Sequence, residues 1–427
     1  MTVRVEGSLI HNVYGSRLEF LEANKHLNPI ESTLIFTTPL GDAILILAVF
    51  IGTLCVDLLG NKDLFKSISN VVLYFMFVIA VMIMVTTNNL LIMFLSFELI
   101  FIPTVYYAYN KGYSRKADKA SEILFYWTLL GAFIVLMALL YIYNTHNTLN
   151  YVYLSREGFT VYETAALFVI IVIGFGIKIP IVPYHYWLLK VHVESPAPFS
   201  IFLSGFLVKS ALYCVYMLMG LVDGQIFYII FLVWVLYSLI IGTLGLVRQV
   251  DFKKLMAWAT IQEMSFMLLL LAFKQLFLTS SCVLFILVHG LMSSLMFYLV
   301  DVLQKRFKTR SIKLSMGLNL TCPKLIPYCW FLILLFSGFP LTLKFYLEWN
   351  LVIMLLESNY YVLLISLFVV NVLGVIFFSR IMLSLMYGSI DESTAKMDIV
   401  DINSKERAII NCLVFTIIIL SFLIYII

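Results

Sequence analysis

The stretch that decides the fold of this chain reads Gly174-Phe175-Gly176-Ile177-Lys178-Ile179-Pro180-Ile181-Val182-Pro183. It places one lysine and two prolines inside an apolar run. Proline lacks a backbone donor and clashes with the preceding helical turn, so a helix that enters this run must break. In lipid the freed carbonyls need partners, and such breaks survive where they line a polar cavity. The stretch therefore predicts a broken membrane helix with an ionisable side chain at the break.

The composition of the whole chain agrees with lipid as its solvent. Of the 427 residues, 62% are hydrophobic and 12% are charged, whereas a soluble domain carries about 25% charged residues. The net charge of +4 is too small to indicate nucleic-acid binding. None of the six cysteines forms a CxxC pair, and no metal-ligand spacing, glycine-rich phosphate loop or catalytic triad is visible. We expect an all-α polytopic membrane protein without a cofactor of its own.

Runs of about 20 apolar residues predict transmembrane helices. We expect about 12 of them, and alternating topology then places most of the 28 lysines and arginines on one side of the membrane. By the positive-inside rule this side is the matrix or cytoplasmic face, and both termini lie on the opposite face. The predicted spans are 34–58, 68–87, 89–108, 122–145, 163–188, 197–220, 226–247, 254–273, 277–302, 325–356, 359–379 and 408–427.

A second proline break lies five predicted spans after the first. It reads Ser337-Gly338-Phe339-Pro340-Leu341-Thr342-Leu343-Lys344, and Glu348 follows two turns beyond Pro340. An odd separation inverts the topology, so the two breaks predict two inverted five-helix repeats, an arrangement typical of ion paths. The alternative is that each proline only kinks its helix. The expected organisation is a polar extension (1–33), a first half (34–220, broken near Lys178–Pro183), a second, inverted half (226–385, broken near Pro340–Glu348), a matrix loop (386–407) and a last transmembrane helix (408–427).

Six ionisable residues inside the predicted spans form the candidate site. A charge at the bilayer centre costs about 2.5–3.5 kcal/mol even on the lenient insertion scale, so each one needs a reason. A desolvated lysine holds its proton only while a carboxylate stabilises the ammonium, so a row of acids and lysines predicts a proton path. The alternative is a set of structural ion pairs, notably Glu98 with Lys178. The six residues are Glu98, Lys178, Lys209, Glu263, His289 and Glu348.

Other polar residues near the two breaks receive different expectations. Lys190, His192 and Glu194 follow the first break at the matrix side, where we expect solvated loop residues. His185 has aromatic neighbours and is expected to be a packing histidine. Lys344 is expected either to supply a polar group in the second break or to cap carbonyls that the break frees.

Four motifs occur together between about residues 85 and 385. The segment from Lys178 to Pro196 is similar to a KxP break followed by HxWLPKAHVEAP. Phe97-Glu98 with Ile102-Pro103-Thr104 is similar to FFE…IPT. The segment Asp251–Leu255 is similar to DLK-L, and the segment His289–Phe297 is similar to HGLxSSxLF. In this combination the chain resembles the chain 4 family of mitochondrial NADH:ubiquinone oxidoreductase (complex I), which are antiporter-like, proton-pumping subunits.

The resemblance implies roles for individual residues. Glu98, Lys178, Lys209, His289 and Glu348 match the proton-path residues of the family, and a glutamate at 348 favours chain 4 because chains 2 and 5 typically carry lysine there. Three departures stand out. Glu263 stands where the family usually has histidine. Two spans instead of four precede the Glu98 helix, which suggests N-terminal shortening. The break at Pro340 has features of chain 2.

The resemblance also implies a cellular setting. We expect a subunit of the mitochondrial inner membrane with both termini at the intermembrane space, and NADH, FMN, iron–sulfur clusters and ubiquinone bound by partner subunits. The expected partners are chains 2 and 5, accessory subunits and membrane lipids. Chain 2 of the same complex, an Mrp-type cation/proton antiporter subunit and a structural scaffold without conduction remain alternatives.

Overall fold

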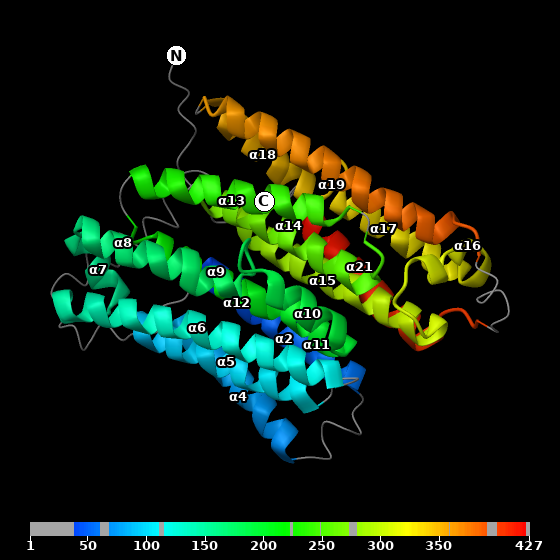
Figure 1. Ribbon diagram of the computed structural model, residues 1–427, viewed down its shortest axis with the longest axis horizontal. Helices are drawn as coiled ribbons and strands as arrows, with labels where there is room; N and C mark the ends of the chain where they lie inside the picture. Colours follow the sequence, from blue (N-terminus) through cyan, green and yellow to red (C-terminus); the bar gives the residue numbers. More distant parts are fainter. Residues whose placement is uncertain are drawn as a thin grey trace.

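The computed structural model describes residues 38–59, 68–110, 115–222, 225–247, 249–272, 280–357, 359–390 and 399–423. Within these ranges the regular structure is helical, and the isolated bridges Asn89–Asn150 and Asp251–Ser311 join loop ends. Figure 1 shows the long helices lying side by side, with α4, α5 and α6 along one edge and α18 and α19 along another. The expected extension at 1–33 lies outside the described residues.

The helices follow each other with short connections in most places. In chain order they are α2 (Pro39–Leu59), α4 (Ile68–Thr86), α5 (Leu90–Asn110), α6 (Arg115–His146), α7 (Tyr151–Glu157), α8 (Val161–Val169), the π-helical η2 (Ile170–Phe175), α9 (Gly176–Lys178), α10 (Tyr186–Glu194), α11 (Ala197–Phe202), the π-helical η3 (Leu203–Leu207), α12 (Val208–Met219), α13 (Gln225–Gly245), α14 (Phe252–Ala272), α15 (Ser280–Phe307), the 3₁₀ turn η4 (Lys313–Ser315), α16 (Leu318–Thr321), the 3₁₀ turn η5 (Pro323–Leu325), α17 (Ile326–Phe336), α18 (Leu343–Glu357), α19 (Tyr361–Tyr387) and α21 (Ser404–Leu423).

The chain is an all-helical, multi-pass membrane protein. Seven helices in the described part are long and apolar enough to cross a membrane, and an eighth span results if the pair 313–321 and 323–336, bent by 94°, counts as one. Shorter apolar helices lie at 39–55, 74–86 and 90–105. Each predicted span contains at least one helix, but several of these helices are too short, or too interrupted, to count as a crossing by length alone.

The centre of the bundle is formed by α14, α15 and the helix through η3. About 89% of the spanning window of each is buried, against 28% for α6 and 22% for α19. The helix α15 contacts α2, α11, α14, α18 and α21, so it joins the two halves of the chain. The outer face of α19 carries exposed apolar side chains such as Val362, Ile365 and Phe368. An apolar face of this size requires lipid or a partner helix against it.

Short polar residues fix where several helices begin. The Thr38 hydroxyl accepts a hydrogen bond from the N–H of Gly41 (3.1 Å), with Pro39 as the first residue of α2. Asp251 accepts one from the N–H of Lys253 (2.9 Å) at the start of α14. Such caps satisfy backbone donors that have no partner in the first helical turn.

Two glycines allow the halves to approach closely at the centre. A Cβ added at Gly290 of α15 would lie 2.9 Å from the carbonyl oxygen of Gly205 in η3, and 2.6 Å from Leu47 Cδ1 of α2. Small residues at helix contacts let the backbones approach in membrane proteins. Lys209 follows Gly205 by four residues, and His289 directly precedes Gly290.

Candidate functional site

The first break separates α9, which ends at Lys178, from α10, which begins at Tyr186. Side chains from neighbouring helices form hydrogen bonds with the backbone groups that the break leaves without helical partners. The indole Nε1 of Trp187 donates to the Ile177 carbonyl (2.7 Å), and that of Trp234 donates to the Val182 carbonyl (2.9 Å). The N–H of Val182 donates to the Ser238 hydroxyl (3.1 Å). The break is therefore a defined structure whose polar groups are satisfied within the protein, as lipid requires.

Lys178 is completely buried and its ammonium forms an ion pair with Glu98 of α5. The same ammonium lies over the rings of Phe97 (4.4 Å to the ring centroid) and Phe101 (5.0 Å). Aromatic faces attract cations, so the pair is held in an otherwise apolar environment. The π-helical η2 directly precedes this lysine, and π-helical turns recur at functional sites.

Lys209 is also completely buried and follows a π-helical turn. Its ammonium donates to the carbonyl of Ser204 inside η3. The charge of Glu263 on α14 acts on it electrostatically. Among the described residues, neither a hydrogen bond nor an ion pair joins Lys209 to Lys178, so proton transfer between these two lysines requires another carrier, such as water.

The second break runs from the end of α17 at Phe336 to the start of α18 at Leu343. The ammonium of Lys344 lies 2.6 Å from Oε1 of Glu263 and 2.6 Å from the carbonyl oxygen of Phe336, and it donates to both. It also lies 3.7 Å from Oε1 of Glu348. Lys344 thus fulfils both expected roles, because it caps a freed carbonyl and supplies a charge.

Lys344 is a buried charge, paired with Glu263, that the predicted row does not include. Its signal was present: it lies four residues before Glu348, the spacing at which side chains meet on a helix. Gly338, with φ of +62°, lets the Glu348 carboxylate approach the break, since a Cβ there would lie 2.7 Å from Oε2. Glu263, Lys344 and Glu348 thus form a cluster from α14 and α18, which we call the second-break cluster.

His289 lies on α15 between the two lysine sites. It is buried, and neither ring nitrogen has a hydrogen-bond partner among the residues that the structure describes. The charges of Lys209 and Lys344 both act on it electrostatically. The printed contacts join Glu263, Lys344 and Glu348 in one cluster and Glu98 with Lys178 in a separate pair, and His289 lies within electrostatic reach of Lys209 and Lys344.

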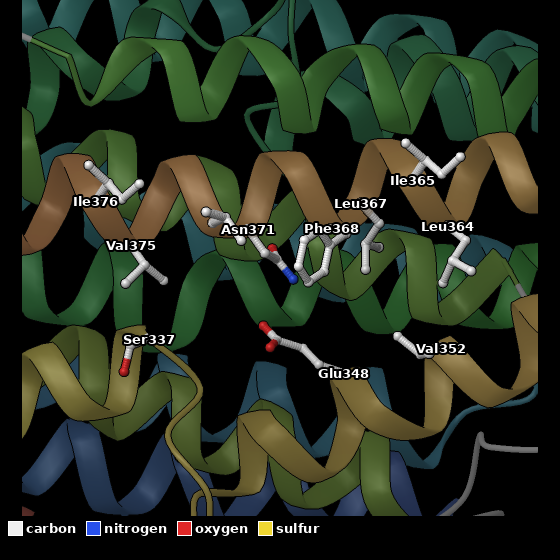
Figure 2. Close-up of a pocket in the computed structure, with 11 residues that line it drawn as sticks. Ser337, Glu348, Val352, Leu364, Ile365, Leu367, Phe368, Asn371, Val375 and Ile376 are labelled. Atoms are coloured by element: carbon white, nitrogen blue, oxygen red, sulfur yellow. The ribbon is translucent and has the colours of Figure 1, made fainter.

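An open groove of about 660 Å³ ends at Glu348. Its walls are apolar residues of α18 and α19, and its polar members are Ser337, Glu348 and Asn371. Figure 2 shows the Asn371 amide and the Glu348 carboxylate facing one another across the groove. The Glu348 side chain, the last of the predicted row, is therefore accessible from the side of the bundle, between α18 and α19.

In the segment that follows the first break, the expectation of solvated residues is wrong for His192. The ring is completely buried and stacks on Phe297 of α15, with 4.4 Å between centroids, because α10 packs into the bundle instead of leaving it. Glu194 lies 3.7 Å from Arg310, whereas Lys190 is exposed. His185 packs against Trp258 (5.0 Å between centroids), as expected of a packing histidine.

Among the residues that the structure describes, no group of three or more His, Cys, Asp or Glu side chains is arranged to hold a metal ion. The chemistry that the site residues offer is proton exchange between amines, carboxylates and an imidazole. All six predicted site residues lie on helices of the bundle, and four of them (Lys178, Lys209, Glu263 and His289) are buried.

Comparisons with known proteins give one consistent result. The family model for NADH:quinone oxidoreductase/Mrp antiporter transmembrane proteins matches residues 87–374. NADH-ubiquinone oxidoreductase chain 4 of Paramecium tetraurelia is 33% identical over 378 residues, which cover 88% of this chain and 79% of that protein. Further chain 4 relatives are covered over 46–66% of their length.

Two solved structures share the fold. Respiratory complex I from Thermus thermophilus with bound aureothin contains a chain with a TM-score of 0.74 and 17% identity, with 97% of this chain and 92% of that chain covered. The Mrp complex from Dietzia contains one with a TM-score of 0.75 and 18% identity, with 90% and 76% covered. At these identities the similarity concerns the fold alone.

Proposed function

The chain belongs to the NADH:quinone oxidoreductase/Mrp antiporter transmembrane family, as a homologue of NADH-ubiquinone oxidoreductase chain 4, and from this premise we propose that it is a proton-translocating subunit in the membrane arm of mitochondrial complex I. The redox chemistry takes place in partner subunits, which bind NADH, FMN, iron–sulfur clusters and ubiquinone. This chain contributes a path along Glu98, Lys178, Lys209, Glu263, His289 and Glu348.

One observation carries the proposal. A buried lysine and a carboxylate meet at each of the two breaks, Lys178 with Glu98 and Lys344 with Glu263, and Lys209 lies buried between them. Desolvation favours the neutral amine, and a nearby carboxylate favours the ammonium. Protonating or displacing a carboxylate therefore makes its lysine release a proton. Lys178 and Lys209 on the path are proton stores of this kind, which neighbouring charges control.

The membrane arrangement is part of the same proposal. We place the chain in the mitochondrial inner membrane with about 12 crossings, in two inverted repeats that each contain one break. Both termini then face the intermembrane space. In this arrangement the partners are the antiporter-like chains 2 and 5, accessory subunits and lipids, and the apolar outer face of α19 contacts one of these or the bilayer.

The test is a substitution of Lys209 in the native complex, reconstituted into sealed vesicles. Lys209→Ala removes the central store without changing a redox centre. We expect substantial loss of proton pumping per electron, while electron transfer from NADH to an artificial acceptor continues. An unchanged ratio of protons to electrons would refute the proposal and favour a scaffold role.

A second candidate function is that of an Mrp-type cation/proton antiporter subunit. The similar fold of a chain in the Mrp complex favours it, and the same row of charges could serve secondary transport. Co-purification separates the two candidates. Association with flavin and iron–sulfur subunits supports the complex I assignment, whereas isolation within an antiporter assembly would overturn it.

A further inference from the structure

Lys344 is the one buried cation of the second-break cluster. Two carboxylates face it from two helices: Oε1 of Glu263 on α14 at 2.6 Å, and Oε1 of Glu348 on its own helix α18 at 3.7 Å. If all three groups were ionised, the cluster would hold two negative charges and one positive charge away from water. Burying an unpaired charge is costly, so the cluster is neutral when it holds one more proton, on one of the carboxylates.

The two carboxylates differ in how they are satisfied. Glu263 is buried and its Oε1 accepts a hydrogen bond from Lys344, while its Oε2 has no hydrogen-bond partner among the described residues. Oε1 of Glu348 has no hydrogen-bond partner among them either. This oxygen is thus a free acceptor 3.7 Å from a donor. It also lies at the groove between α18 and α19, on the outer side of the cluster.

We propose that Lys344 itself carries the proton between Glu263 and Glu348, an inference that rests on the proposed proton path and adds a residue to it. In the first step a Nζ–H bond of the Lys344 ammonium breaks and an Oε1–H bond forms on Glu348, which leaves a neutral amine. In the second step the lone pair of this amine takes the proton that Glu263 has received from the side of Lys209 and His289. Glu263 is again a carboxylate, Lys344 is again an ammonium, and one proton has moved to Glu348.

The geometry suits this shuttle. The ammonium stays anchored to the Phe336 carbonyl (2.6 Å), so a small side-chain movement exchanges its carboxylate partner without uncapping the break. Lysine has three donors on a flexible stem and can lose a proton when it is desolvated. The competing view is that Lys344 only ties α14 to α18 as an ion pair, with its proton fixed.

Arginine at position 344 distinguishes the two views. A guanidinium keeps the positive charge and pairs well with carboxylates, but it does not give up its proton in proteins. We therefore expect Lys344→Arg to lose pumping per electron as fully as Lys344→Gln. Lys305→Arg is the matched control, because Lys305 forms an ion pair with Asp301 (2.5 Å) at the exposed end of α15. The control should pump as the unaltered complex does.

A second variant tests the proposal even if the complex with Lys344→Arg does not assemble. The double variant Glu263→Gln, Lys344→Gln removes both charges of the closest ion pair, so the buried Glu263 carboxylate is not left without its cation. We expect it to assemble and to transfer electrons, with pumping lost. Assembly is measured as the amount of intact complex, and pumping as the proton gradient formed per NADH oxidised in reconstituted vesicles.

The outcomes separate this inference from the proposed function. Full pumping in Lys344→Arg, or in the double variant, would overturn the role of Lys344 as a carrier. If Lys209→Ala still abolishes pumping in that case, the proton path stands without Lys344. If Lys209→Ala pumps normally as well, the proposed function falls together with the inference.

Discussion

Adding one methyl group at the contact between the two halves should disturb both stability and conduction. In Gly290→Ala the new Cβ would lie 2.6 Å from Leu47 Cδ1 and 2.9 Å from the Gly205 carbonyl oxygen. The Leu47 side chain can rotate away, but the carbonyl belongs to the backbone of η3, so α15 and η3 must separate. Overpacking of this kind costs about 1–3 kcal/mol. Since each 1.4 kcal/mol corresponds to about tenfold in an equilibrium constant, the folded state should be less favoured by roughly 5- to 140-fold.

The measurement is the thermal midpoint of the detergent-solubilised complex together with pumping per electron in vesicles. Gly52→Ala on α2 is the control, because its Cβ would meet only side chains, the Tyr74 ring at 3.3 Å and the Phe77 ring at 3.9 Å. We expect Gly290→Ala to lower the midpoint more than this control and to reduce pumping, since His289 and Lys209 flank the contact. A Gly290→Ala complex as stable as the Gly52→Ala complex would show that the two halves are not in tight contact here.

Two further predictions concern the supports of the site. Trp187→Phe leaves the buried Ile177 carbonyl without its hydrogen-bond donor, which should lower the stability by about 1–3 kcal/mol. Trp330 is 40% exposed and its indole donates to Tyr387, so the control Trp330→Phe should lower the stability less. Equal thermal midpoints for the two variants would contradict the role of Trp187 in the break. Glu406 lies at the start of α21, before the predicted span. Burial raises the pKa of its carboxyl group, but hydrogen bonds from Arg306 and from the N–H of Asn403 have the larger combined effect and hold this pKa below its usual 4.5. A lowered pKa stabilises the folded state above pH 4.5, and this stabilisation is lost as the pH falls through the folded-state value. Glu406→Gln should therefore flatten the acid part of the stability curve, followed by intrinsic fluorescence, and the exposed Glu357→Gln should leave it unchanged.

The first break could be predicted from local sequence because its cause is local. Prolines at 180 and 183 prevent helix continuation whatever surrounds them, and the structure has its helix ends at Lys178 and Tyr186. The number of membrane crossings is a different matter. The run 325–356 divides into α17 and α18 at the predicted Pro340 break, whereas the bend of 94° between 313–321 and 323–336 lies at the start of this run. A count of apolar residues does not register such bends.

The partners of the charged residues could be predicted less well. Glu98 and Lys178 were recognisable as a pair because each is a charge that lipid cannot accept alone. His192 gave no comparable signal, since a histidine near a loop is usually solvated, and its burial depends on Phe297 arriving from α15. For Lys344 the sequence predicts carbonyl capping or a polar role in the break. It does not predict the contact with Glu263, because the two residues are 81 positions apart in the chain.

The amino-acid sequence by itself determined that this protein resides in a membrane, that its helices break at two proline-containing segments and that a few charges must lie where charges are costly. These properties follow from composition and from the covalent structure of proline, which act at every position independently of distant residues. Only the tertiary structure decided which charges meet. Glu263 and Lys344 are 81 residues apart in sequence and 2.6 Å apart in space, because α14 and α18 both pack against α15. Contacts of this kind depend on the packing of whole helices, and the energy that fixes them is distributed over the buried core.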